Sequence, residues 1–259
     1  MRNALKIDLK RSMLAPSFLL SVCIIFLWLV LNSLEDITGE RNSSWFRVEY
    51  ILNLATTGFD RFTNLLLAIA ATAYAWSYCQ DKDSGFMEQV VGRVGLRTYA
   101  VSKVAATALS AFFASVIAMG LFTGFLYIWL GQEMPVDHLG NIAYLNTAGA
   151  GKTGLYYFYR FTVTGISCSL GAVFGLMVTA FIPNVYMAFL TPLMAFYVYG
   201  IFVSVFHIMP RWLRLDVLMF AQVWEDDVSS FFAAVVELSV LIALCGWIFC
   251  RRLRKERTE

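Results

Sequence analysis

The chain has 259 residues, of which 59% are hydrophobic and only 15% are charged. A soluble domain has about half apolar and about a quarter charged residues, so a single soluble core of this size is excluded. Disorder is excluded too, because disordered chains combine low hydrophobicity with high charge. The mean hydropathy of +0.66 indicates a membrane protein, and the net charge of +2 lacks the basic character of nucleic-acid-binding proteins.

Stretches without Asp, Glu, Lys or Arg indicate the membrane spans, since a spanning helix needs about 20 apolar residues. The longest stretch, 161–210, would reach about 75 Å as one helix, far beyond a hydrocarbon core of about 30 Å. It must therefore turn, and Ile182-Pro183-Asn184 near its middle disfavours helix. The stretches do not alternate in polarity as barrel strands would. We predict an all-α integral membrane protein, one domain over 1–259, with six transmembrane helices at 14–34, 62–80, 104–130, 160–182, 185–208 and 229–250.

Six spans place both termini on the same side of the membrane, and the positive-inside rule selects that side. Most Lys and Arg residues lie in the N-terminal tail, in the segment 81–103 and in the tail after Cys250. Most acidic residues lie in the other loops, so we predict that both termini are cytoplasmic. The basic start followed by an apolar run resembles a signal peptide. Leu31-Asn32-Ser33-Leu34 offers no small-x-small cleavage site, so we interpret this run as an uncleaved anchor.

The segment 81–103, between the second and third predicted spans, is the most informative connection. Asp83 or Ser84 can cap a helix there, Glu88 suits the positive end of a helix dipole, and Gly92 and Gly95 then weaken the helix. We predict a short amphipathic helix that either anchors the loop at the membrane surface or docks on another protein, and the residues leave both open. Its apolar residues, which recur at helical spacing, are Phe86, Met87, Val90, Val91 and Val94.

The six spans, the cytoplasmic termini, the short loops and this segment together resemble the permease subunit of ABC-2 type transporters. In that family the segment after the second span often has an acidic residue, Gly, Glu, an apolar turn, Arg, an aromatic residue, and Lys where the third span begins. The family often has Pro before the Arg, where this chain has Val94-Gly95-Leu96. The similar positions are Asp83, Gly85, Glu88, Val90-Val91, Arg97, Tyr99 and Lys103.

The resemblance implies that this segment contacts a separate cytoplasmic ATPase subunit, present in two copies, and transmits its closure. Our hypothesis is that this closure pivots the first, second and fifth spans. It implies a second permease chain, either a copy or a paralogue. It also implies that ATP and Mg²⁺ are bound by the partner, and that this chain binds no cofactor and is not an enzyme. The coupling residues that it implies are Asp83, Gly85, Phe86, Glu88, Val90, Arg93, Arg97 and Lys103.

The segment Asn146–Thr153 almost matches the phosphate loop G-x-x-x-x-G-K-[ST], with Asn146 in place of the first Gly. The residues before it form only a weak strand pattern, and no second nucleotide-binding element follows. The predicted topology also places Lys152 outside the cell, where there is no ATP to bind. We interpret this segment as a flexible outer loop.

Glu237 is the only formally charged residue inside a predicted span, and such residues are costly and are functional candidates by default. It can bond inside the bundle, line a translocation path, or couple transport to protons.

No metal site is expected, because His138 and His207 are far apart and no H-E-x-x-H occurs. The five cysteines lie in or beside spans and predict no disulfide framework. Glu225-Asp226-Asp227 is interpreted as a solvated helix start, in which Asp227 or Ser229 caps the last span.

Pro192 predicts a kink in the fifth span. Small residues at helical spacing predict close approach between helices, either inside the bundle or at a seam with another subunit. They are Gly165, Ser169, Ala172 and Gly175 in the fourth span, and Gly120 and Gly124 in the third.

From these patterns and the resemblance we expect an ATP-driven exporter subunit in a bacterial plasma membrane. Its substrate would be apolar or amphipathic, such as a peptide, a lipid or a drug, including self-immunity to an antimicrobial peptide. Two other classes are weighed against it. An ion-coupled carrier would use Glu237, and a polytopic membrane enzyme would need clustered polar catalytic residues, which the sequence does not present.

Overall fold

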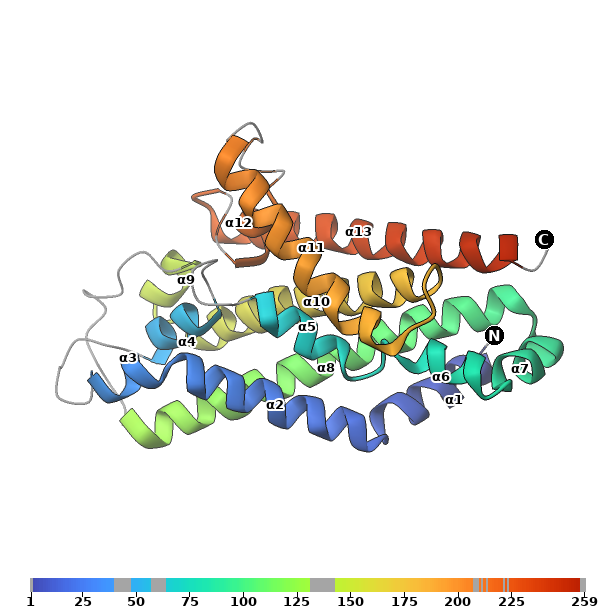
Figure 1. The fold of residues 1–259 in the computed structure, drawn as a ribbon. Coiled ribbons are helices and arrows are strands. Elements are labelled where there is room, and N and C mark those ends of the chain that lie inside the picture. The colour runs from blue at the N-terminus through green and yellow to red at the C-terminus, as the bar shows by residue number, and fades with distance from the viewer. Residues whose placement is uncertain are drawn as a thin grey trace.

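The computed structural model describes residues 2–39, 48–56, 64–130, 143–206, 210, 212, 214–220, 222 and 224–256. Across these residues the secondary structure is helical, with no strand (Figure 1). Two stretches outside the described residues bear on the predictions. They are 131–142, which contains His138, and 207–209, which contains His207. The helices are α1 (Arg2–Met13), α2 (Pro16–Asn32), α3 (Leu34–Gly39), α4 (Val48–Thr56), α5 (Asn64–Ala71), α6 (Ser77–Asp83), α7 (Phe86–Val94), α8 (Leu96–Leu130), α9 (Leu145–Gly149), α10 (Thr153–Thr179), α11 (Val185–Phe206), α12 (Leu215–Phe220) and α13 (Asp227–Glu256).

Helix α10 forms the centre of the bundle and packs against α5, α8, α11 and α13. Its glycines permit these approaches. A Cβ on Gly175 would lie 2.2 Å from the Ala188 carbonyl oxygen of α11, and one on Gly165 would lie 2.7 Å from the Phe112 ring of α8. The small residues predicted in this helix therefore pack inside the bundle. The pair on α8, Gly120 and Gly124, instead meets open space.

Four helices in the described chain are long and apolar enough to cross a membrane, namely α8, α10, α11 and α13. The bent pair of α1 and α2, with an angle of 51° between them, makes a fifth if it counts as one span. All five lie where spans are predicted, and the turn between α10 and α11 falls at Pro183. The remaining predicted span, the second at 62–80, is not a continuous helix, because the chain there is divided into α5 and α6.

Side-chain hydrogen bonds account for the break between α5 and α6. The Thr72 hydroxyl donates to the Ile69 carbonyl at 2.6 Å, and the Trp76 indole donates to the Thr72 carbonyl at 3.1 Å. The Ser17 hydroxyl of α2 donates to the Ala73 carbonyl at 3.1 Å. A side chain that enters the helical hydrogen-bond ladder bends or interrupts it, and in an apolar medium each freed carbonyl needs a partner. Hydropathy alone does not reveal such a break.

Helix α1 is a further departure, since only a basic tail is predicted before the first span. It packs along α8 and buries a polar face, with Asp8 8% exposed and Ser12 fully buried one helical turn later. Pro16 occupies the start of α2 and keeps Ala15 extended, which separates the two helices. The chain therefore folds its N-terminal segment onto the bundle instead of releasing it.

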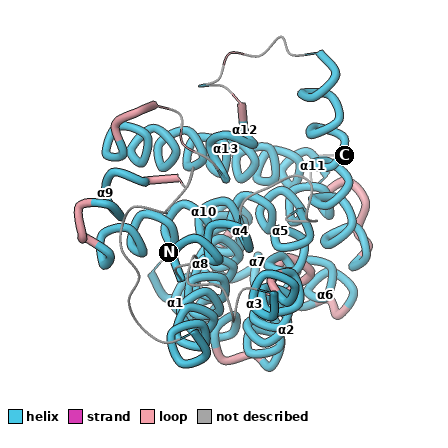
Figure 2. The backbone as a smooth tube through the Cα atoms, turned by 90° about the vertical axis from the view of Figure 1, so that its left-hand side faces the viewer, coloured by secondary structure: helices cyan, strands magenta, loops and turns pink. Residues whose placement is uncertain are grey.

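The bundle has two distinct ends (Figure 1). The first turn of α1, the α6–α7 hairpin and the last turn of α13 lie together at one end, which we call the basic end. Helices α3, α4 and α9 lie at the opposite end. Helix α4 occupies a predicted loop and buries Ile51, Leu52 and Glu49. Seen along the bundle in Figure 2, the last part of α11 stands away from the other helices.

Candidate functional site

Helix α7 is the short helix that the sequence predicts in the segment 81–103. It lies between two glycines with positive φ, Gly85 at +69° and Gly95 at +82°, which allow the chain to turn sharply on both sides. The predicted cap is wrong, because no side chain caps α7 and the Ser84 hydroxyl bonds back to the Gln80 carbonyl of α6 at 2.8 Å. The helix is therefore defined by glycine turns at its two ends.

The two faces of α7 differ as predicted for an amphipathic helix. Val91 is 4% exposed, and with Met87 and Val90 it packs on a cluster that includes Tyr99 of α8 and Phe249 of α13. The apolar face is thus covered by the protein itself. The outer face exposes Phe86, Glu88, Gln89, Gly92, Arg93 and Val94.

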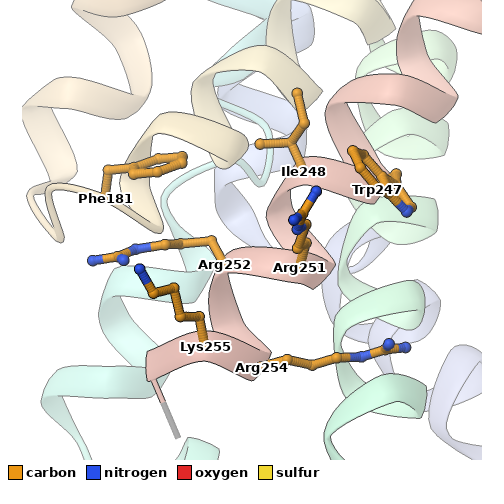
Figure 3. A pocket seen from close by; sticks show the side chains of 7 residues that line it. All are labelled: Phe181, Trp247, Ile248, Arg251, Arg252, Arg254 and Lys255. Atoms are coloured by element: carbon orange, nitrogen blue, oxygen red, sulfur yellow. The ribbon is translucent and has the colours of Figure 1, made fainter. Parts of the chain in front are cut away.

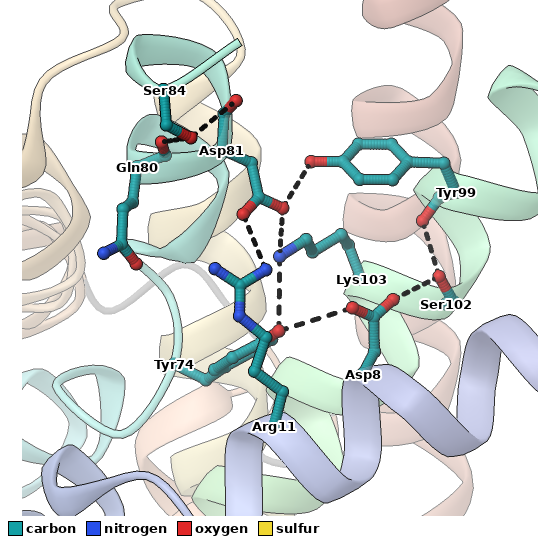
Figure 4. Close-up of polar contacts among 9 residues, drawn as sticks. All are labelled: Asp8, Arg11, Tyr74, Gln80, Asp81, Ser84, Tyr99, Ser102 and Lys103. Atoms are coloured by element: carbon teal, nitrogen blue, oxygen red, sulfur yellow. Dashed lines mark hydrogen bonds and ion pairs between the residues drawn. The ribbon is translucent and has the colours of Figure 1, made fainter. Parts of the chain in front are cut away.

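Behind α7 lies a set of charged and polar side chains centred on Asp81, the first charged residue of α6 (Figure 4). The Asp81 carboxylate is fully buried and contacts Lys103 Nζ at 2.6 Å and Arg11 Nη1 at 2.8 Å. The Tyr99 hydroxyl donates to the same carboxylate at 3.0 Å. One carboxylate therefore joins α1, α6 and the first turns of α8.

A second carboxylate extends this arrangement. Lys103 Nζ donates to the Tyr74 hydroxyl at 3.2 Å, and that hydroxyl donates to Asp8 Oδ1 at 3.4 Å. The Ser102 hydroxyl donates to Asp8 Oδ2 at 2.5 Å. Two acids thus balance the buried Lys103 and the partly exposed Arg11, as buried charges require. We call the whole set the ionic network, and it consists of Asp8, Arg11, Tyr74, Asp81, Tyr99, Ser102 and Lys103.

The ionic network holds both sides of α7. Asp81 lies before the helix, whereas Tyr99 and Lys103 lie after it, so the contacts close the α6–α7–α8 loop on itself. Arg11 adds α1 to this closure and also lies over the Phe86 ring, 5.0 Å from its centroid. Charged pairs are strongest where water is excluded and every group is bonded, so this loop is a rigid element.

The structure separates the predicted coupling residues into two groups. Lys103 is fully buried in the ionic network, so it lies out of reach of any partner, and Val90 is half-buried. Gly85 forms the turn before α7. The residues exposed at the basic end are Asp83, Phe86, Glu88, Arg93 and Arg97.

At the opposite end the segment that resembles a phosphate loop bonds to the protein's own carboxylate. The Thr147 amide and hydroxyl donate to Asp227 Oδ2 at 2.7 and 2.6 Å, and the Gln222 amide donates to Oδ1 at 2.8 Å. Asp227 therefore ties α9 to α13. The predicted cap of the last span by Asp227 or Ser229 is wrong. The cap is Asp226, which accepts from the Ser229 hydroxyl and amide, and these bonds lower the pKa of the Asp226 carboxyl.

Sequence reasoning places Arg160 at the edge of a span, but the structure buries it fully in α10. Its Nε and Nη2 atoms donate to the Thr56 hydroxyl of α4 at 3.1 and 2.7 Å. Glu49 of α4 is 3% exposed and accepts from the Tyr157 hydroxyl at 3.2 Å. The signal in the sequence is the helical spacing of three polar residues, Glu49, Asn53 and Thr56, within an otherwise apolar stretch.

Glu237 lies partly exposed on α13. Helical periodicity places it on the same face as Leu241, Leu244 and Ile248. No hydrogen bond or ion pair of its carboxylate is found among the described residues. Among all the described residues, no three His, Cys, Asp or Glu side chains are close enough to hold a metal ion. The five cysteines form no disulfide with one another.

Comparison of the chain with protein-family models, with curated proteins and with solved structures found no match.

Proposed function

We propose that this chain is the membrane-spanning subunit of an ABC-2 type exporter, and that α7 receives the motion of a separate ATPase subunit. The observation that carries the proposal is the rigid closure of α7 by the ionic network. A helix on a loose loop would absorb a push, whereas α7 is fixed to α1, α6 and α8 by the buried carboxylate of Asp81.

The position of α7 supports this role. It lies at the end of the bundle that also holds the first turn of α1 and the basic last turns of α13 (Figure 1). The positive-inside rule assigns such an end to the cytoplasm, where ATPase subunits are found. Phe86, Glu88 and Arg93 on its outer face offer an aromatic, an acidic and a basic contact to a partner surface.

The length of α8 supplies the means of transmission. It begins directly after Gly95 and runs for 35 residues without interruption. At about 1.5 Å per residue such a helix spans about 52 Å, which is more than the membrane thickness. ATPase closure that tilts α7 would therefore tilt α8 and α1 as levers. This differs from the expected pivot of the first, second and fifth spans, because no residue of α11 belongs to the ionic network.

The substrate class follows from the walls of the bundle. The exposed surfaces of α11 and α13 are aromatic and aliphatic, with Tyr197 and Phe232 near 60% exposed. An apolar or amphipathic peptide, lipid or drug suits such surfaces, and a second permease chain would complete the path. An ion-coupled carrier is the alternative, and the observation that favours it is the unbonded Glu237 carboxylate on α13.

Co-purification from native membranes in mild detergent tests the proposal. The tagged chain is expected to retain an ATPase subunit, and Glu88→Lys is expected to reduce its recovery at least tenfold, because the variant reverses an exposed charge on α7. Glu225→Lys is the matched control, since it makes the same reversal on an exposed residue at the opposite end. Equal ATPase recovery with both variants, at equal membrane insertion, would contradict the assignment of α7.

A further inference from the structure

A groove runs along the outside of the bundle between α8 and α13, with a volume of about 420 Å³. Its walls are small and apolar and include Val101, Ala105 and Ala108 of α8 and Ala243 of α13. Gly246 lets the two helices approach at its floor, because a Cβ there would lie 2.9 Å from the Val104 side chain. The groove is therefore lined mainly by apolar side chains, as a channel for a hydrocarbon chain would be.

The length of the groove matches one leaflet of a bilayer. The helical rise from Arg97 to Ala108 is about 16 Å, and that from Ser239 to Arg254 is about 22 Å. Half of a hydrocarbon core is about 15 Å. Arg97 and Arg254 flank the groove at the basic end only, so their guanidinium groups lie at the depth of a lipid headgroup when an acyl chain fills the rest.

A second pocket of about 630 Å³ adjoins this mouth (Figure 3). Four of the described residues that line it are cations, and Trp247 and Arg254 line both spaces. Arg251 lies over the Trp247 ring at 5.3 Å and Arg252 lies over the Phe181 ring at the same distance, which orients both guanidinium groups. The four cations are Arg251, Arg252, Arg254 and Lys255.

We propose that the α8–α13 groove binds an anionic phospholipid of the leaflet at the basic end. One acyl chain lies along the groove, and Arg97 and Arg254 bind the headgroup phosphate. Charge complementarity selects this occupant, because basic pockets between membrane helices favour anionic headgroups, whereas a zwitterionic lipid gains little there. Guanidinium groups also bind phosphate oxygens in bidentate geometry. The site is independent of any ATPase partner.

Fluorescence quenching by brominated lipids tests the proposal on the purified chain alone. The Trp247 signal is the difference between the parent protein and Trp247→Phe. Dibromo-phosphatidylglycerol is expected to bind beside Trp247 roughly 30-fold more tightly than dibromo-phosphatidylcholine, since each basic residue contributes about fivefold. In the Arg97→Gln/Arg254→Gln double variant this preference falls to near one. Lys10→Gln, an exposed cation at the same end that lines neither space, retains it.

Filling the groove gives a second measurement that leaves the arginines in place. Ala243→Phe is expected to reduce quenching by the anionic lipid severalfold, whereas Val236→Phe, on an exposed part of α13 outside the groove, leaves it unchanged. Equal quenching by the two lipids in the parent protein would overturn the proposal, because the groove would then be ordinary lipid-facing surface. Loss of quenching by both lipids together with α13–α13 cross-linking would also overturn it in favour of a second copy. Because no ATPase is present, either result leaves the proposed function untouched.

Discussion

At the scale of single residues, charges that look isolated in the sequence become partners in the fold. Long stretches of chain separate Asp8, Asp81 and Lys103. In the fold Lys103 pairs directly with Asp81 and is linked to Asp8 through the Tyr74 hydroxyl. A buried carboxylate without a cation would be far more costly than an exposed one. The sequence therefore contains a constraint that only the packed helices satisfy.

Lys103→Met is predicted to lower the free energy of unfolding by about 3 kcal/mol, because it leaves the buried Asp81 with one cation instead of two. Lys82→Met is the matched control. It makes the same chemical change in the exposed pair with Glu256, and an exposed pair contributes about 0–1 kcal/mol. Unfolding in mixed micelles, followed by circular dichroism, measures both.

A double-mutant cycle identifies the cause of that loss. In an Asp81→Asn background Lys103→Met is expected to lower the free energy of unfolding by clearly less than in the parent protein, because the negative charge that Lys103 neutralises is absent. Equal costs in the two backgrounds, or equal costs for the Lys103 and Lys82 variants, would show that the ionic network does not stabilise the basic end.

At the scale of elements, the sequence predicts the long apolar helices and α7, and it does not predict the irregular ones. Hydropathy locates α8, α10, α11 and α13 because their surfaces face an apolar medium over a full span. It misses the folding of α1 onto α8, because the buried face of α1 is polar. It also misses the break at Thr72, which depends on hydrogen bonds from neighbouring side chains.

The candidate site divides in the same way. The apolar spacing of α7 can be read from the sequence, since it is a local property. The role of Lys103 cannot, because its position at the start of a predicted span fits a surface cation equally well. Its burial depends on Asp8 and Asp81, which come from distant parts of the chain.

The glycines around α7 allow a direct test of its geometry. Gly85→Ala is predicted to destabilise the protein by about 1–2 kcal/mol, because an L residue is strained at a φ of +69° even though the added methyl meets open space. Gly92→Ala also meets open space but lies inside α7, where Ala is the better helix former, so it is predicted to stabilise by up to about 1 kcal/mol. Thermal unfolding in detergent measures both changes, and a stabilising Gly85→Ala would contradict the turn.

At the scale of the whole molecule, the two ends of the bundle are built differently. The basic end concentrates α7, the ionic network and the cationic turns of α13, whereas the opposite end is closed by α4, α9 and the Asp227 contacts (Figure 1). Helix α8 runs from one end to the other and contacts α1, α2 and α10 along the way. A force applied at α7 therefore reaches the opposite end through one continuous helix.

Photo-cross-linking from α7 in intact native cells tests this account most directly. A photoreactive residue replaces Gln89, which is exposed on the outer face of α7, and the same probe at Glu225 serves as the control at the opposite end. The account predicts that the Gln89 probe joins a separate chain with a complete G-x-x-x-x-G-K-[ST] phosphate loop, and that the Glu225 probe does not. If the Gln89 probe instead captures only lipid, or is reached by a membrane-impermeant reagent added outside the cell, the account is contradicted.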